Sequence, residues 1–120
     1  MLKVLKFGGS SMADAAQFAK IKAIVESDDS RRVMVVSAPG KRFKDDHKVT
    51  DLLYKISDAA ASQDQAQTRE LLAELRQRHV NLASQLLEQS PMMKEDAVAR
   101  VNAICDDLDG LAYAVCAVGE

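Results

Sequence analysis

The feature that most constrains the fold is the run Lys-Val-Leu-Lys-Phe-Gly-Gly-Ser-Ser at residues 3–11. The apolar residues at 2–7 are typical of a buried strand, and the pair Gly8 and Gly9 separates that strand from a helical pattern. Glycines let the backbone approach a ligand closely, and a helix start directs N–H groups and the positive end of its dipole to the same place. Lys6 adds a positive charge at the strand end. This stretch therefore predicts a phosphate-binding turn.

A second strand is predicted by the continuous apolar run at residues 33–36, which favours a strand covered on both faces of a parallel sheet. Between the strands, Ser11 is expected to cap a helix, with Asp14 in the position of a capping box. This strand–helix–strand unit places the carboxyl ends of both strands, at Lys6 and Ser37, on one sheet edge. Ligands bind at this edge in open α/β sheets.

Residues 37–48 are polar and charged and contain Pro39 and Gly40, so we expect a long, solvated and mobile loop over the ligand edge. Its sequence Asp-Asp-His at residues 45–47 could suggest a metal site, but a solvated segment is the favoured interpretation, and we predict no metal ligands. The loop's basic residues could attract phosphate or carboxylate groups. They are Lys41, Arg42, Lys44 and Lys48.

Three helices are predicted after this loop: one from Thr50, one over residues 65–89 and a long one after Pro91. The last two are predicted to form an antiparallel helical hairpin that packs through apolar residues. The stripes comprise Leu71, Leu72, Leu75, His79, Leu82 and Leu86, and then Val98, Val101, Ile104, Cys105, Leu108, Leu111, Ala112 and Val115. Cys105 and Cys116 lie roughly 16 Å apart along one helix, which excludes a disulfide, so both are expected to be buried as small hydrophobic residues.

The composition indicates a globular domain, because 48% of the 120 residues are hydrophobic and 28% are charged. A net charge of −2 gives no general reason to bind nucleic acid or an anionic membrane. The sequence contains no transmembrane run and no signal-peptide pattern, so we expect a cytoplasmic protein. Two strands are too few for a typical sheet, and we expect the chain to be the N-terminal piece of a longer protein.

The glycine pair matches neither the P-loop nor the three-glycine dinucleotide fingerprint. Four motifs nevertheless occur in order: Lys6-Phe7-Gly8-Gly9-Ser10-Ser11, Val35-Val36-Ser37-Ala38, Val49-Thr50-Asp51-Leu52-Leu53 and Gly119-Glu120. In this order they resemble the N-terminal part of aspartokinases, within the amino acid kinase superfamily. The pair Ser11-Met12 and the long charged loop before Val49 depart from the common pattern.

The resemblance implies an α/β fold, here an incomplete three-layer α/β/α amino-acid-kinase-like fold with a parallel sheet core and a long helical hairpin. Residues 1–120 would be the N-terminal portion of the catalytic domain, with the nucleotide-binding half and the ACT regulatory domains beyond Glu120. The whole enzyme would transfer the γ-phosphoryl group of ATP, bound with Mg²⁺, to the β-carboxylate of L-aspartate in lysine, threonine and methionine biosynthesis. It would be a homo-oligomer, and this chain alone would be inactive.

The resemblance also implies the site residues. Lys6 would be catalytic, neutralising the transferring phosphoryl group, and the ATP phosphates would meet Lys6, Phe7, Gly8, Gly9 and Ser10. The hydroxyl groups of Ser37 and Thr50 would bind aspartate, and Glu120 would pair with its α-ammonium group. Each residue also has a plainer interpretation: Lys6 as a surface lysine, Ser10, Ser11 or Thr50 as a helix cap, and Glu120 as an ordinary residue at the chain end.

Two alternatives remain open. The enzyme could be another amino acid kinase, acting on glutamate, acetylglutamate or carbamate, although Thr50-Asp51 and Gly119-Glu120 favour aspartate. From a different class, the chain could be a non-catalytic module that dimerises through its helical hairpin or an unpaired sheet edge.

Overall fold

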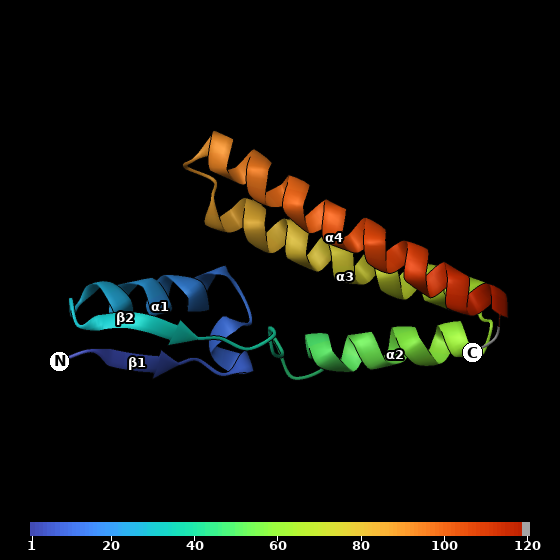
Figure 1. Cartoon of the computed structure of the whole chain (residues 1–120), viewed down its shortest axis with the longest axis horizontal. Coiled ribbons are helices and arrows are strands. Elements are labelled where there is room, and N and C mark those ends of the chain that lie inside the picture. The colour runs from blue at the N-terminus through green and yellow to red at the C-terminus, as the bar shows by residue number, and fades with distance from the viewer. Residues whose placement is uncertain (119–120) are drawn as a thin grey trace. The chain divides into compact units, whose positions relative to one another are not determined.

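The computed structural model describes residues 1–118. It divides into two compact units, with the boundary between Thr50 and Asp51. The elements are β1 (Lys3–Lys6), the 3₁₀ turn η1 (Gly9–Met12), α1 (Ala15–Glu26), β2 (Arg31–Val35), α2 (Val49–Ala61), α3 (Gln65–Leu86) and α4 (Pro91–Val118) (Figure 1). The predicted α/β class, with a parallel sheet and a long helical hairpin, is confirmed.

The first unit is built on the two strands, which pair in parallel. Lys6 lies opposite Val35, and the Phe7 amide extends the ladder by donating to the Val35 carbonyl oxygen at 2.9 Å. Parallel pairing brings both carboxyl ends to one edge. The prediction that the carboxyl ends of the strands, at Lys6 and Ser37, share one sheet edge is therefore confirmed.

The predicted coverage of both strand faces is wrong for the described residues. Val33 is 41% exposed, Met34 49%, and Val36, just beyond β2, 60%. Helix α1 contacts β2, and among the described elements it is the one that packs against the strands. An apolar, β-branched run favours a strand because its side chains fit a pleated surface, and this fit does not supply a second covering layer.

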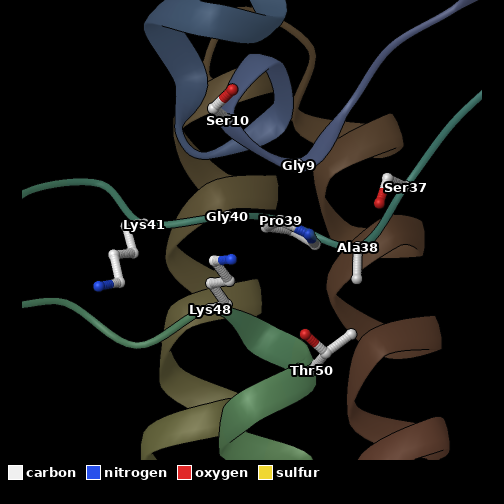
Figure 2. Close-up of a pocket in the computed structure, with 9 residues that line it drawn as sticks. All are labelled: Gly9, Ser10, Ser37, Ala38, Pro39, Gly40, Lys41, Lys48 and Thr50. Atoms are coloured by element: carbon white, nitrogen blue, oxygen red, sulfur yellow. The ribbon is translucent and has the colours of Figure 1, made fainter.

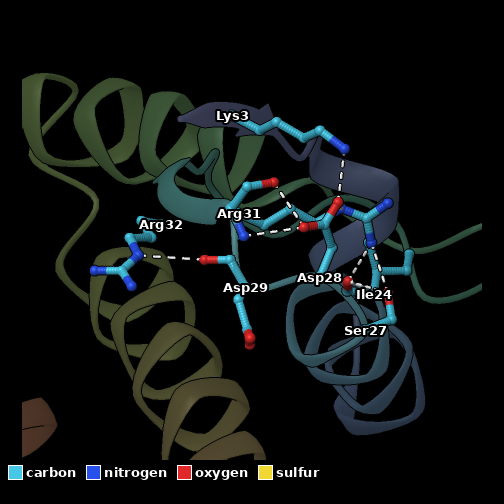
Figure 3. Close-up of polar contacts among 8 residues, drawn as sticks. Lys3, Ile24, Ser27, Asp28, Asp29, Arg31 and Arg32 are labelled. Carbon is cyan, nitrogen blue, oxygen red and sulfur yellow. Dashed lines mark hydrogen bonds and ion pairs between the residues drawn. The ribbon is translucent and has the colours of Figure 1, made fainter. Parts of the chain in front are cut away.

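The turn between α1 and β2 is fixed by a polar cluster around Asp28 (Figure 3). The Asp28 carboxylate accepts hydrogen bonds from Lys3 Nζ at 2.6 Å, from the Ser30 hydroxyl at 2.6 Å and from the Ser30 amide at 2.9 Å. These bonds, led by the one from Lys3, hold the pKa of Asp28 well below its usual range. Because Lys3 belongs to β1, the cluster ties the turn to the first strand, at the end remote from Ser37.

The expected cap at Ser11 is also corrected. Ser11 lies inside η1, and Asp14 caps α1 by accepting a hydrogen bond from the Gln17 amide at 3.0 Å. A tight 3₁₀ turn therefore lies between the glycine pair and the α-helix. Met12 at its end is buried, and its sulfur accepts a hydrogen bond from the Ser37 amide at 3.3 Å. The turn thus packs beneath the end of β2.

Two glycine residues far apart in the sequence let the turn and the loop after β2 meet. The Gly40 amide donates to the Gly9 carbonyl oxygen at 2.7 Å. A Cβ atom on Gly40 would lie 2.7 Å from Gly9 C and 2.9 Å from Ser10 N, which no real side chain tolerates. Glycine is required at position 40 because backbone meets backbone there.

The second unit contains the helical hairpin of α3 and α4, joined through residues 87–90 (Figure 1). Leu71, Leu72 and Leu75 are buried as expected, and so are Cys105 and Cys116. Ile104 and Leu111, predicted for the packed face, are 69% and 64% exposed instead. Cys105 and Ala112 of the same predicted stripe are buried, so the packed face of α4 is narrower than predicted and leaves Ile104 and Leu111 at its exposed edge.

Arg76 joins the two hairpin helices through several acceptors. Its guanidinium donates to the Asn102 side-chain oxygen at 2.9 Å, to Asp106 at 2.8 Å and to Asp109 at 2.7 Å. The two aspartate partners raise the pKa of Arg76. The side chains of Arg76 and Asp109 are 26% and 28% exposed, so solvent screens this pair less than a fully exposed one. Over residues 1–118, the helices offer no stretch apolar enough to cross a membrane.

Replacing Arg76 should destabilise the hairpin. Arg76→Met is expected to lower the free energy of unfolding by about 1–3 kcal/mol, because hydrogen bonds between charged groups are lost. The matched control is Arg100→Met, which removes an exposed pair with Asp96 inside α4 at 3.0 Å and should cost only about 0.3–0.5 kcal/mol. Urea denaturation followed by circular dichroism measures both. Equal losses would contradict the inter-helix role of Arg76.

The glycine contact gives a second prediction. Gly40→Ala should force the loop away from the turn and cost about 1–3 kcal/mol through overpacking. Gly8→Ala should cost far less, since a Cβ there meets nothing within 4 Å and its φ of −79° suits alanine. Thermal unfolding of the two variants makes the comparison. A Gly40→Ala protein as stable as Gly8→Ala would show that the backbones need not touch.

Candidate functional site

A cavity of about 490 Å³ lies at the carboxyl ends of the two strands, within the first unit (Figure 2). Three segments line it. The η1 turn supplies Gly9 and Ser10, residues 37–41 follow β2, and Lys48 and Thr50 lie at the start of α2. The cavity is large enough for an amino acid or a phosphoryl group, and it lies where open α/β sheets bind ligands.

Four of the residues predicted for the site line this one cavity: Gly9, Ser10, Ser37 and Thr50. They come from three segments of sequence, and the parallel register together with the Gly9–Gly40 hydrogen bond brings them together. Hydroxyl groups and a glycine-lined backbone suit an anionic or zwitterionic ligand. In Figure 2 the Thr50 hydroxyl points toward the Pro39–Gly40 segment.

The other predicted residues lie elsewhere. Lys6 is exposed at the end of β1 and does not line the cavity. The Phe7 side chain is buried and its amide donates to Val35, so Phe7 serves the sheet. Gly8 has an extended backbone that precedes η1. Glu120 lies outside the described residues.

The loop over residues 37–48 is held by specific contacts, and residues 41–45 and 48 are exposed, as expected for a solvated segment. The Arg42 amide, Nε and Nη2 donate to the two carboxylate oxygens of Asp46 at 2.9, 2.6 and 2.8 Å. The Asp46 side chain is only 4% exposed, and its bonds with Arg42 hold the pKa of its carboxyl group well below the usual range. Arg42 also stacks over the Phe43 ring, 5.6 Å from its centroid. The pair closes a compact turn.

Sequence reasoning missed the contributions of Pro39 and Gly40 to the cavity, whereas Lys41 and Lys48 were among the basic residues expected to attract anions. The signal available was a Pro-Gly pair directly after a buried-type strand, which marks a tight turn. No local sequence pattern predicts that Gly40 contacts Gly9, because the two residues are 31 positions apart. The basic residues of the loop could be noticed, but their placement depends on the turn between Arg42 and Asp46.

The potential metal ligands among the described residues are dispersed. Over residues 1–118 no three histidine, cysteine or acidic side chains gather closely enough to hold an ion. His79 Nδ1 lies 2.9 Å from the Leu75 carbonyl oxygen inside α3. Burial raises the pKa of the Cys105 thiol, which disfavours the thiolate form that binds metals.

Comparison with known proteins agrees with the geometry. A model of the Amino acid kinase family matches residues 1–112. Aspartokinase 3 of Bacillus subtilis (strain 168) is 60% identical over 52 residues, which are 43% of this chain and 12% of that protein. The crystal structure of Clostridium acetobutylicum aspartate kinase superposes with a TM-score of 0.60 at 33% identity, over 85% of this chain and 27% of the other.

The chain thus spans about a quarter of the solved relative and about an eighth of the curated one. The family match, in contrast, covers residues 1–112 of this chain. It includes both strands, the residues that line the cavity and most of the hairpin. The chain therefore belongs to the amino acid kinase family.

Proposed function

We propose that this chain is the N-terminal part of the catalytic domain of an aspartate kinase. The complete enzyme transfers the γ-phosphoryl group of ATP to the β-carboxylate of L-aspartate and releases ADP and an acyl phosphate. Two observations support aspartate among the possible acceptors: the similarity to two aspartate kinases and the presence of Ser37 and Thr50 in one cavity. The chain supplies the aspartate side of the active site, and the remainder of the protein supplies the nucleotide side.

The observation that carries the proposal is the cavity itself. It joins a glycine turn, the hydroxyl-bearing residues Ser37 and Thr50, and two lysine residues at the carboxyl edge of the parallel strands. An attacking carboxylate is already an anion, so the reaction needs no general base. Catalysis then consists of holding two anions together and neutralising the charge that develops between them. A cavity rich in donors and positive charge suits that task.

In this proposal each group of residues has its own role in binding or catalysis. The Gly9 and Ser10 turn lies beside the transferring phosphoryl group, while the hydroxyl groups of Ser37 and Thr50 hydrogen-bond aspartate. Lys6, at the end of β1 just before the turn, neutralises charge on the phosphoryl oxygens. Glu120 would pair with the α-ammonium group. The carboxylate oxygen forms a bond to phosphorus as the bond from phosphorus to ADP breaks.

Magnesium would accompany ATP, neutralising its phosphates, and this chain offers no ligand set of its own for the ion over residues 1–118. We further propose a cytoplasmic homo-oligomer that acts in lysine, threonine and methionine biosynthesis. The solved relative is described as an allosteric enzyme. Allostery in an oligomer of this protein would depend on segments other than the cavity described above.

The test uses the complete protein whose reading frame contains this chain. With ATP, Mg²⁺ and L-aspartate, hydroxylamine should trap an acyl phosphate as the hydroxamate. Parallel reactions with L-glutamate, N-acetyl-L-glutamate and carbamate compare the other acceptors. Product from one of these acceptors and none from aspartate would refute the substrate assignment.

Lys6 provides the mutational test. Lys6→Ala should reduce kcat by about 10²–10³-fold, the usual loss when one charge-stabilising group is removed. Lys20→Ala is the matched control, because Lys20 is exposed on α1 and does not line the cavity. Its kcat should equal that of the unmodified enzyme. Full activity in Lys6→Ala would overturn the catalytic role of Lys6.

A further inference from the structure

The cavity has a positive charge that the proposed residues do not explain. Of the described residues that line it, two are charged, and both are lysines, Lys41 and Lys48. An acidic side chain is absent from this lining. Two positive charges without a negative one favour an anion in the cavity.

Two backbone hydrogen bonds hold the ends of the loop, and a side-chain pair closes the turn between them. The Gly40 amide donates to Gly9 O at 2.7 Å, and the Val49 amide donates to Pro39 O at 3.0 Å. Between these ends, Arg42 and Asp46 close the turn. Lys48 directly precedes Val49, so its backbone is fixed beside the cavity.

The two lysines point differently. In Figure 2 the Lys48 side chain runs toward Gly40, whereas the Lys41 side chain extends away from it. The same view shows Lys48 and Thr50 on one side of the Pro39–Gly40 segment, and Gly9 and Ser10 on the other. In this view Lys48 therefore lies on the same side as Thr50, which is assigned to aspartate.

We propose that Lys48 binds a carboxylate of the amino acid substrate and that the Arg42–Asp46 pair positions it. The proposal rests on the proposed function and adds a residue to its substrate side. Lys48 supplies a full positive charge to the cavity that Thr50 also lines, and a dicarboxylate such as aspartate needs one. Asp46 acts only through the turn: it is buried against Arg42, and it is not among the residues that line the cavity.

The kinetic test uses the complete protein. Lys48→Met should raise the KM for L-aspartate by about 10–100-fold, the loss expected for one charge-assisted hydrogen bond, and leave the KM for ATP unchanged. Lys48→Arg should recover part of the loss. Lys44→Met is the matched control, since Lys44 is an exposed lysine of the same loop outside the cavity lining. Asp46→Asn should raise the KM for L-aspartate in the same direction and leave kcat near its original value, as a positioning residue would.

An unchanged KM for L-aspartate in Lys48→Met overturns the proposal. A rise in the KM for ATP alone also overturns it, because Lys48 would then meet a phosphate. If the unmodified protein forms no acyl phosphate with aspartate, the proposed function fails on its own, and binding still tests Lys48.

That binding test needs no variant. The unmodified complete protein is acetylated with sulfosuccinimidyl acetate, and modification of Lys48 and Lys44 is measured by peptide mass spectrometry. L-Aspartate should protect Lys48 and leave Lys44 unprotected, whereas inorganic phosphate should protect Lys48 much less. Equal modification of Lys48 with and without L-aspartate, or stronger protection by phosphate, would overturn the assignment.

Discussion

The contact between Gly9 and Gly40 is the constraint on which the candidate site depends. A hydrogen bond of 2.7 Å joins two backbone segments that have no side chains between them. It sets the glycine turn after β1 against the loop after β2, and the cavity lies where these segments meet the start of α2. A side chain at position 40 would separate them. The close contact of the two backbone segments thus forms the site and positions the side chains that line it.

The strands make that approach possible. Parallel pairing with Lys6 opposite Val35 aligns the carboxyl ends, so the segments that leave both strands start from one edge. The Asp28 cluster ties the opposite end of β1 to the turn between α1 and β2 (Figure 3). One end of the strand pair is therefore fixed by charged side chains, and the other is left to glycine, hydroxyl and lysine groups that suit a ligand.

The loop after β2 shows how charge is distributed between structure and function. The buried Asp46 and the partly exposed Arg42 neutralise one another in a pair that closes the turn. Lys48 lines the cavity, and Lys44 is exposed outside its lining. Residues of one short charged segment thus differ in role, because the turn decides which of them meets the cavity. Composition alone cannot make that distinction.

The resemblance to aspartokinases implied that Thr50 belongs to the site, and the residue pattern by itself determined the strands, the helices and the sheet edge at Lys6 and Ser37. Hydrophobic periodicity and the positions of the glycines are enough to predict the strands, the helices and this edge, because these features depend on residues that are near one another in sequence. Only the tertiary structure decided that Gly40 meets Gly9, that Ile104 and Leu111 are exposed on α4, and that Lys41 and Lys48 line one cavity with Ser37 and Thr50. These outcomes depend on contacts between distant residues, such as Gly9 with Gly40, whose energies no local pattern contains.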